Sequence, residues 1–275
     1  MTELHRSDWF LRAYRHLPHA ALNRAARAVA SLERPRPLVD AAVRAWVRRD
    51  GIDLDDFEQR RFRSLEDFFL RRLREGARPL AASALLFPAD GAVVGAGTLS
   101  ADTMLQVKGK TLSVDRVVHG RAPLDPWDLT SLRRWVTVFL RPRGYHYVHA
   151  PCDAVLRAVR WIPGRFFPQN EDALRVINGI YEQNERASLL FDTAFGPLLL
   201  VLVGASLIGG IELAGIDRAR WARVGSPLQV TRAVGRGEEL GHFTFGSTVV
   251  TLLPDVPGVL PEQGREIRMG EAMVG

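Results

Sequence analysis

Cysteine is almost absent from this sequence, where one residue, Cys152, stands among 275. A single thiol cannot form an internal disulfide, and it cannot supply the several thiolates of a structural zinc site. This scarcity fits a reducing compartment. We interpret Cys152 itself as a small buried apolar residue.

Long hydrophobic runs are also missing. A membrane-spanning helix needs roughly 18 to 20 consecutive apolar residues. The best candidate, residues 197–211, is shorter and is interrupted by three glycines. It predicts two buried strands around a turn, and we expect no spanning helix. The N-terminus lacks the order of a secretory signal, although its arginine-rich, acid-poor character leaves a mitochondrial transit peptide open.

Acidic residues are outnumbered, and the formal net charge is +6. Such a charge favours an anionic partner, either nucleic acid or an acidic lipid surface. The arginines are scattered among apolar helix faces and no nucleic-acid recognition motif accompanies them, so we expect no nucleic-acid partner. With 47% hydrophobic and 25% charged residues, the composition is that of a globular protein.

Residues 1–64 differ from the rest of the chain because apolar side chains recur at helical spacing in three basic segments. Two interpretations stay open. The helices lie in a bilayer interface with arginines toward anionic headgroups, or they pack on the protein's own core. In the first case Trp9, Phe10 and Trp46 are candidates to insert into the bilayer, and in the second they pack within the protein.

A different texture follows. Residues 64–67 resemble a capping box and predict a helix that carries Phe68 and Phe69. From Leu85 onward, short runs of Val, Leu, Ile and Phe alternate with Gly and Pro, which is typical of antiparallel strands. The pattern predicts an α+β fold: a predominantly antiparallel β-sheet domain over residues 65–275, with N-terminal amphipathic helices set to one side.

Three short segments carry candidate chemistry. Gly246-Ser247-Thr248 precedes a strand-like run and, alone, indicates only a glycine turn. His146 and His149 lie three apart, but Gly, Val and Pro around them favour an extended or bent segment, in which two separate roles fit better than one metal site. Asp90, in Pro88-Ala89-Asp90-Gly91, reads by itself as a turn residue.

Together these segments resemble the phosphatidylserine decarboxylase family, whose terminal Gly-Ser-Thr motif is present here. Further matching blocks are Phe68-Phe69 with Arg78-Pro79, Pro88-Ala89-Asp90-Gly91, Gln106-Val107-Lys108-Gly109, Tyr145-His146 with His149 and Pro151, Asn184-Glu185-Arg186, and Val203-Gly204-Ala205.

The chain also departs from the family pattern. Gly144 stands where Asp is usual, Tyr147 where Arg or His is common, Phe245 where Leu is frequent, and Gln169-Asn170-Glu171 replaces Val-Asn-Pro. None of these changes removes a group that the chemistry requires. They bear on the local backbone shape and on headgroup selection.

The resemblance implies self-cleavage between Gly246 and Ser247 into a large β chain, residues 1–246, and a small α chain, residues 247–275. Ser247 Oγ attacks the Gly246 carbonyl, and the residue becomes a covalent pyruvoyl cofactor. A serine needs a base to accept its proton and a carboxylate to orient that base. By resemblance, His149 is the base and Asp90 its orienting partner.

The implied reaction converts phosphatidylserine to phosphatidylethanolamine and CO2, with an imine of the pyruvoyl ketone as electron sink. His146 is then the acid that protonates the former α-carbon, with a structural histidine as the alternative. No metal is expected. Lys108 is a candidate phosphate contact, although a solvated lysine fits its position better.

The substrate is a lipid, so the resemblance implies a peripheral protein on an anionic membrane surface, at the cytoplasmic face of a bacterial cell membrane, docked by residues 1–64. Its two chains are expected to stay together as a heterodimer, with further dimerisation open. Alternatives are a processing-dead relative that binds lipid, a β-rich interaction module, and a pyruvoyl decarboxylase for a different amino-group substrate.

Overall fold

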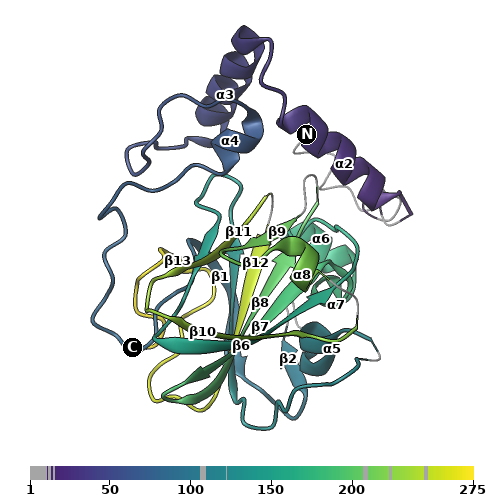
Figure 1. Ribbon diagram of the computed structural model, residues 1–275, viewed down its shortest axis with the longest axis vertical. Helices are drawn as coiled ribbons and strands as arrows, with labels where there is room; N and C mark the ends of the chain where they lie inside the picture. The colour runs from purple at the N-terminus through teal and green to yellow at the C-terminus, as the bar shows by residue number, and fades with distance from the viewer. Residues whose placement is uncertain are drawn as a thin grey trace.

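The structure is a computed structural model that describes residues 11, 14, 16–105, 110–121, 123–206, 210–222, 225–244 and 247–275. Figure 1 shows a β-rich body with the N-terminal helices set apart at one end. The described helices are α2 (His19–Ala30), α3 (Arg36–Asp50), α4 (Leu65–Phe69), α5 (Val114–His119), α6 (Glu171–Val176), α7 (Ile180–Gln183) and α8 (Arg218–Trp221).

An eight-stranded sheet forms the body, and every strand pairing in it is antiparallel. This confirms the predicted α+β class. In spatial order the strands are β10 (Leu228–Val234), β6 (Ala154–Ile162), β7 (Arg186–Thr193), β8 (Gly196–Gly204), β12 (Ser247–Leu253), β4 (Arg134–Leu140), β1 (Gly91–Thr98) and β13 (Glu266–Ile267).

Both faces of the sheet are covered, which explains why its central strands are continuously apolar rather than alternating. One face packs against a small sheet of β5 (Tyr147–His149), β11 (Glu239–Phe243) and β9 (Ile211–Leu213). The other packs against α5, α6, α7 and the hairpin of β2 (Thr103–Leu105) and β3 (Thr111–Ser113). Val249 therefore lies in one core and its neighbour Val250 in the other, because successive strand residues point to opposite faces.

The helix start predicted at residues 64–67 is present as α4. Ser64 Oγ accepts a hydrogen bond from the Asp67 backbone N–H at 3.0 Å. The Asp67 carboxylate accepts one from the Arg63 N–H at 2.8 Å rather than from the N–H of Ser64 itself. The shorter Asp side chain thus closes a variant of the capping box, and α4 buries Phe68 and Phe69.

Helix α3 packs on α4 through its apolar face. The rings of Trp46 and Phe68 meet at a centroid distance of 5.3 Å, and the Trp46 indole N–H donates to Asp50 at 2.8 Å. Val43 and Val47 join the same cluster. Trp46 is therefore a packing residue in this structure, while Trp9 and Phe10 lie outside the described residues.

Helix α2 leaves apolar side chains in solvent. Val29 is 63% exposed and Leu32, just after α2, is 55% exposed, while Leu38 near the start of α3 is 66% exposed. Leu17 and Leu22 are also exposed. No helix in the described ranges is both long and apolar enough to cross a bilayer.

Candidate active site

Ser247 is the first residue of β12, a central strand bonded to a neighbour on each side. Leu140 of β4 and Gly204 of β8 lie opposite Ser247 in the two pairings. Its side chain is fully buried. A serine at this place is held by the sheet on both sides, with its position set by the backbone register.

His146 lies directly against Ser247. The loop before β5 brings its Nδ1 to 3.2 Å from Ser247 Oγ. The imidazole is fully buried and stacks on the Phe69 ring at a centroid distance of 3.8 Å. Its Nε2 is buried with no hydrogen-bond partner among the described residues. Phe69 of α4 therefore helps to hold the histidine against the serine.

Burial, and after it the nearby positive charge of Arg71, together lower the pKa of His146 to about 3. The neutral imidazole at pH 7 can accept the Ser247 hydroxyl proton at Nδ1. Arg71 is itself buried between the rings of Phe57 and Phe68, 4.6 and 4.8 Å from its guanidinium carbon. Sequence reasoning made no prediction for Arg71, because its placement also depends on the carbonyls of Arg143 and Gly144, to which its guanidinium donates and which lie more than 70 positions along the chain.

His149 has other partners. Its Nδ1 lies 2.8 Å from the Gly237 carbonyl oxygen, so this nitrogen carries the proton and donates. Nε2 then accepts from the Tyr145 hydroxyl at 3.0 Å. Burial lowers the pKa of His149, which keeps it neutral near pH 7. In the described structure His149 makes no hydrogen bond to Ser247.

Asp90 is held by arginine. Arg78 Nη2 donates to Asp90 Oδ2 at 2.6 Å, and the Met269 backbone N–H donates to Oδ1 at 2.8 Å. The expected orienting contact between Asp90 and His149 is not formed here. The two segments are nevertheless adjacent, because the backbone N–H of His149 donates to the carbonyl of Pro88, two residues before Asp90. The structure thus brings His146 and Ser247 together, and places Asp90 and His149 on adjoining segments.

Gln169 links the two strands at the position of Ser247, a contact that sequence reasoning missed. The next residue of β12, Thr248, donates from its hydroxyl to Gln169 Oε1, with a heavy-atom distance of 2.5 Å. Gln169 Nε2 donates to the Gly204 carbonyl on β8 at 2.9 Å, and Asn184 Nδ2 donates to the same oxygen. The only sequence signal was that Gln169 departs from the family pattern.

Some of the other residues named from the sequence are described by the structure, and some lie outside the described residues. The preserved Asn170 caps α6, accepting from the Ala173 N–H at 2.9 Å. Gly246 and Phe245, like the block with Lys108, lie outside the described residues. Cys152 is buried in the core, as interpreted, and burial raises the pKa of its thiol to about 11.

Comparison of the sequence with known proteins identifies a family. A family model described as phosphatidylserine decarboxylase matches residues 65–275. The chain belongs to the phosphatidylserine decarboxylase family. Asp90, His146, His149 and Ser247 all lie within the matched range, and the family assignment makes the chain a decarboxylase.

Individual relatives extend the similarity over almost the whole chain. The phosphatidylserine decarboxylase proenzyme of Acidovorax ebreus (strain TPSY) is 35% identical over 270 residues, covering 94% of each chain. That of Polaromonas naphthalenivorans (strain CJ2) is 35% identical over 274 residues, covering 94% of this chain and 93% of the relative. That of Methylibium petroleiphilum is 36% identical over 250 residues, covering 86% and 87%.

The pKa of His146 predicts how the stability of this decarboxylase depends on pH. A histidine with a lowered pKa in the folded state stabilises the fold above its unfolded pKa of about 6.5, and this contribution is lost as the pH falls toward the folded value. We expect protonation of His146 in the unfolded chain to lower the free energy of unfolding by about 1.4 kcal/mol for each pH unit below 6.5. Urea unfolding of the Ser247→Ala protein between pH 7 and 5 measures it.

Replacing His146 by Gln should reduce the change in the free energy of unfolding with pH by that amount. The control His16→Gln, at an exposed site, should leave this pH dependence as it is in the parent. Equal slopes for the parent and His146→Gln would show that the buried imidazole takes up a proton in the folded state.

The Gln169 contacts predict a coupled loss of stability. Gln169→Val leaves the buried Thr248 hydroxyl without the Gln169 acceptor. We therefore expect the free energy of unfolding, measured in urea, to fall by about 1 to 3 kcal/mol. Thr248→Val in addition should recover part of the loss, because no orphaned hydroxyl remains. Strict additivity of the two substitutions would show that the pair is not coupled.

Proposed function

We propose that this chain is a phosphatidylserine decarboxylase whose pyruvoyl cofactor is made from its own Ser247. The observation that carries the proposal is the contact between Ser247 Oγ and the neutral, buried imidazole of His146. The family match supports decarboxylase chemistry, and the curated relatives are named as proenzymes, which fits maturation by cleavage.

Self-cleavage begins with attack of Ser247 Oγ on the Gly246 carbonyl, which moves the acyl group from nitrogen to oxygen. Loss of the Ser247 α-proton then expels the Gly246 carboxylate and leaves dehydroalanine, which water hydrolyses to the ketone with release of ammonia. The first step needs a base at Oγ and the second needs a base at the α-carbon. Water-excluding burial around Ser247 keeps competing hydrolysis away from the ester.

A pyruvoyl group at this chain end supplies a ketone that binds the substrate amine and accepts electrons as CO2 leaves. The residues around Ser247 fit such a group, because a neutral imidazole already lies against its position and an aromatic ring stacks on that imidazole. His146 contacts the side chain that becomes the cofactor, which supports its predicted role beside the reacting carbon. Because its imidazole is neutral, it must first take up a proton at this site before it can deliver one to that carbon.

For the cleavage step the proposal retains His149 as base and Asp90 as its orienting partner. His149 must then exchange its Tyr145 contact for one with Ser247, and the Arg78 contact must leave an Asp90 oxygen for His149. His146 is the competing base, since it already lies within hydrogen-bond distance. The two assignments differ in which substitution blocks cleavage.

We propose that the small chain stays in place after cleavage, giving a heterodimer of residues 1–246 and 247–275. Strand β12 is paired with β4 and β8 along its length, and its side chains are buried on both faces. Withdrawing it would expose two strand edges and a large apolar surface.

Maturation is tested by intact-protein mass spectrometry. The freshly purified protein should contain residues 247–275 as a separate chain with a hydroxylamine-reactive carbonyl at its start and no free amine there. Ser247→Ala should remain one polypeptide, because the nucleophile is gone. An unbroken wild-type chain with no reactive carbonyl would instead indicate a processing-dead lipid-binding relative.

The His variants divide the roles in the same assay. His149→Asn should stop cleavage, whereas His146→Asn should still be cleaved but release no CO2 from phosphatidylserine vesicles. The reverse pattern would transfer the base to His146. Release of CO2 from soluble serine compounds but not from the lipid would favour a different amino-group substrate. Matching thermal unfolding curves control for misfolding.

We propose that α2 and the start of α3 dock the protein on an anionic membrane surface. Large apolar side chains are exposed along this stretch, and arginines accompany them, including Arg24, Arg34 and Arg36. In Figure 1 the two helices stand away from the main sheet. A helix of this kind inserts its apolar side chains among the acyl chains while its basic residues meet anionic headgroups.

Docking predicts that replacing Val29, Leu32 and Leu38 together by Ser weakens liposome binding. At about 1 kcal/mol for each partly inserted side chain the loss is roughly a hundredfold in partitioning. Co-sedimentation with vesicles containing phosphatidylglycerol measures it.

The matched control replaces Phe195 and Val259 by Ser, since these are exposed to 39% and 77% but lie far from α2 in sequence and on other segments. Equal losses in both variants, or no loss in the first, would refute docking through α2 and α3.

A further inference from the structure

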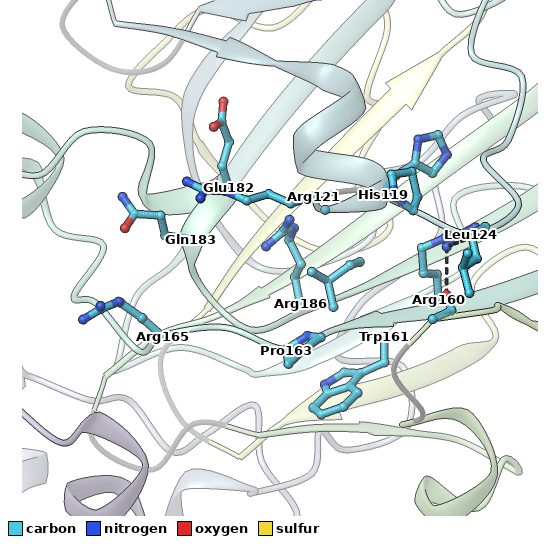
Figure 2. A pocket seen from close by; sticks show the side chains of 14 residues that line it. His119, Arg121, Leu124, Arg160, Trp161, Pro163, Arg165, Glu182, Gln183 and Arg186 are labelled. Atoms are coloured by element: carbon cyan, nitrogen blue, oxygen red, sulfur yellow. Dashed lines mark hydrogen bonds between the residues drawn. The ribbon is translucent and has the colours of Figure 1, made fainter.

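A cavity lies on the face of the main sheet opposite to Ser247. Its volume is about 460 Å³, and it is lined by residues of α5, β6, α7 and the first residue of β7 (Figure 2). Arg186 of β7 is in register with Val203, which is in register with Thr248. Thr248 and Ser247 point to opposite faces because they are consecutive in β12. The cavity is therefore separate from the reaction centre.

The lining of this cavity is strongly basic. Four arginines contribute to it, and Glu182 is the one carboxylate among its described residues; the arginines are Arg121, Arg160, Arg165 and Arg186. The Glu182 carboxylate already accepts from the Ser113 backbone N–H at 2.9 Å and lies 3.7 Å from Arg116. In Figure 2 the Arg186 guanidinium stands near the centre of the labelled side chains, with Arg160 to one side.

Two of these arginines are buried without an acidic partner. Arg186 is 1% exposed, and its guanidinium donates to the carbonyls of Val117, Asn184 and Arg116. These bonds use three of its five N–H groups. No carboxylate of the described residues lies within ion-pair distance of it.

Arg160 shows the same arrangement. It is 2% exposed and donates to the carbonyls of Leu124, Gly225 and Asp125, while its Nε finds no partner among the described residues. The Asp125 carboxylate is not within ion-pair distance, and only its backbone oxygen makes contact.

Carbonyl dipoles compensate a buried guanidinium only in part. Burial lowers the pKa of Arg186 to about 10 and lowers that of Arg160, so both remain charged near neutral pH. A structural role in holding α5 and the neighbouring loops explains the carbonyl contacts. It does not explain why two buried cations with unused N–H groups line a cavity that two further arginines also line. An anion in the cavity would offset the desolvation cost.

We propose that this cavity is a binding site for a phosphate-bearing anion. Phosphate fits because the planar guanidinium presents paired N–H donors to two oxygens at once. A cavity of this size has room for a phosphate with a small attached group. The ligand is either a soluble phosphate ester or the phosphate of a lipid headgroup.

A lipid headgroup could reach the cavity because the cavity lies next to the segment that contacts the start of α2. Pro163 and Arg165 line it, and the next residue, Phe166, donates its N–H to His19 Nδ1 at 3.3 Å. His19 is the first residue of α2. Binding at this site is independent of cleavage at Ser247, so a failure of the proposed function leaves the inference intact.

The test titrates the purified full-length protein with inorganic phosphate, glycerol 3-phosphate and dihexanoyl phosphatidylglycerol below its micelle concentration. Isothermal calorimetry at constant ionic strength, with chloride as reference, measures binding. We expect saturable binding that Arg121→Gln weakens roughly tenfold, the loss of one hydrogen bond to a charged group. Arg121 is exposed, so this variant should fold, which thermal unfolding checks.

The matched control is Arg157→Gln, on the same strand as Arg160 but 49% exposed and paired with Asp192 at 3.0 Å. It removes the same charge outside the cavity and should bind like the parent. Tighter binding of the lipid than of glycerol 3-phosphate would identify a headgroup, and equal or weaker binding a soluble ester. Absence of saturable binding by all three probes, or equal weakening by both substitutions, would overturn the proposal.

Discussion

The structure depends on a serine being held in the middle of a sheet, against an imidazole that is too deeply buried to carry charge. Ser247 begins a strand that is paired on both sides, so its Oγ has one environment set by the register. His146 reaches it from a loop across the small sheet, and Phe69 holds the imidazole from above the ring plane. The proposed self-cleavage would gain from this arrangement, because the sheet would hold the reacting atoms in place when one backbone bond is lost.

Three arginines are buried without a carboxylate partner among the described residues. Arg71 lies between two aromatic rings near the reaction centre, while Arg160 and Arg186 lie among backbone carbonyls on the far side of the sheet. Each is held by π-faces or dipoles rather than by a carboxylate of the described residues. Near His146 the positive charge helps keep the imidazole neutral, and around the cavity that Arg160 and Arg186 line it is the basis of the proposed anion site.

Sequence reasoning and structure agree most closely where the signal is local. Short apolar runs separated by Gly and Pro predicted antiparallel strands, and residues 64–67 predicted the helix start that Ser64 caps. They differ where the answer depends on distant partners. Asp90 was expected beside His149, but Arg78 and the Met269 backbone hold it, and a carboxylate's choice between an arginine and a histidine is not encoded in its own turn.

The sequence by itself determined the fold class and the family, because strand patterns and motif residues occupy consecutive positions. Only the tertiary structure decided that His146 contacts Ser247, that Gln169 joins Thr248 to Gly204, and that two arginines meet around one cavity. Those contacts join residues separated by 26 to 101 positions. Burial and strand register decide them, and both are properties of the assembled sheet.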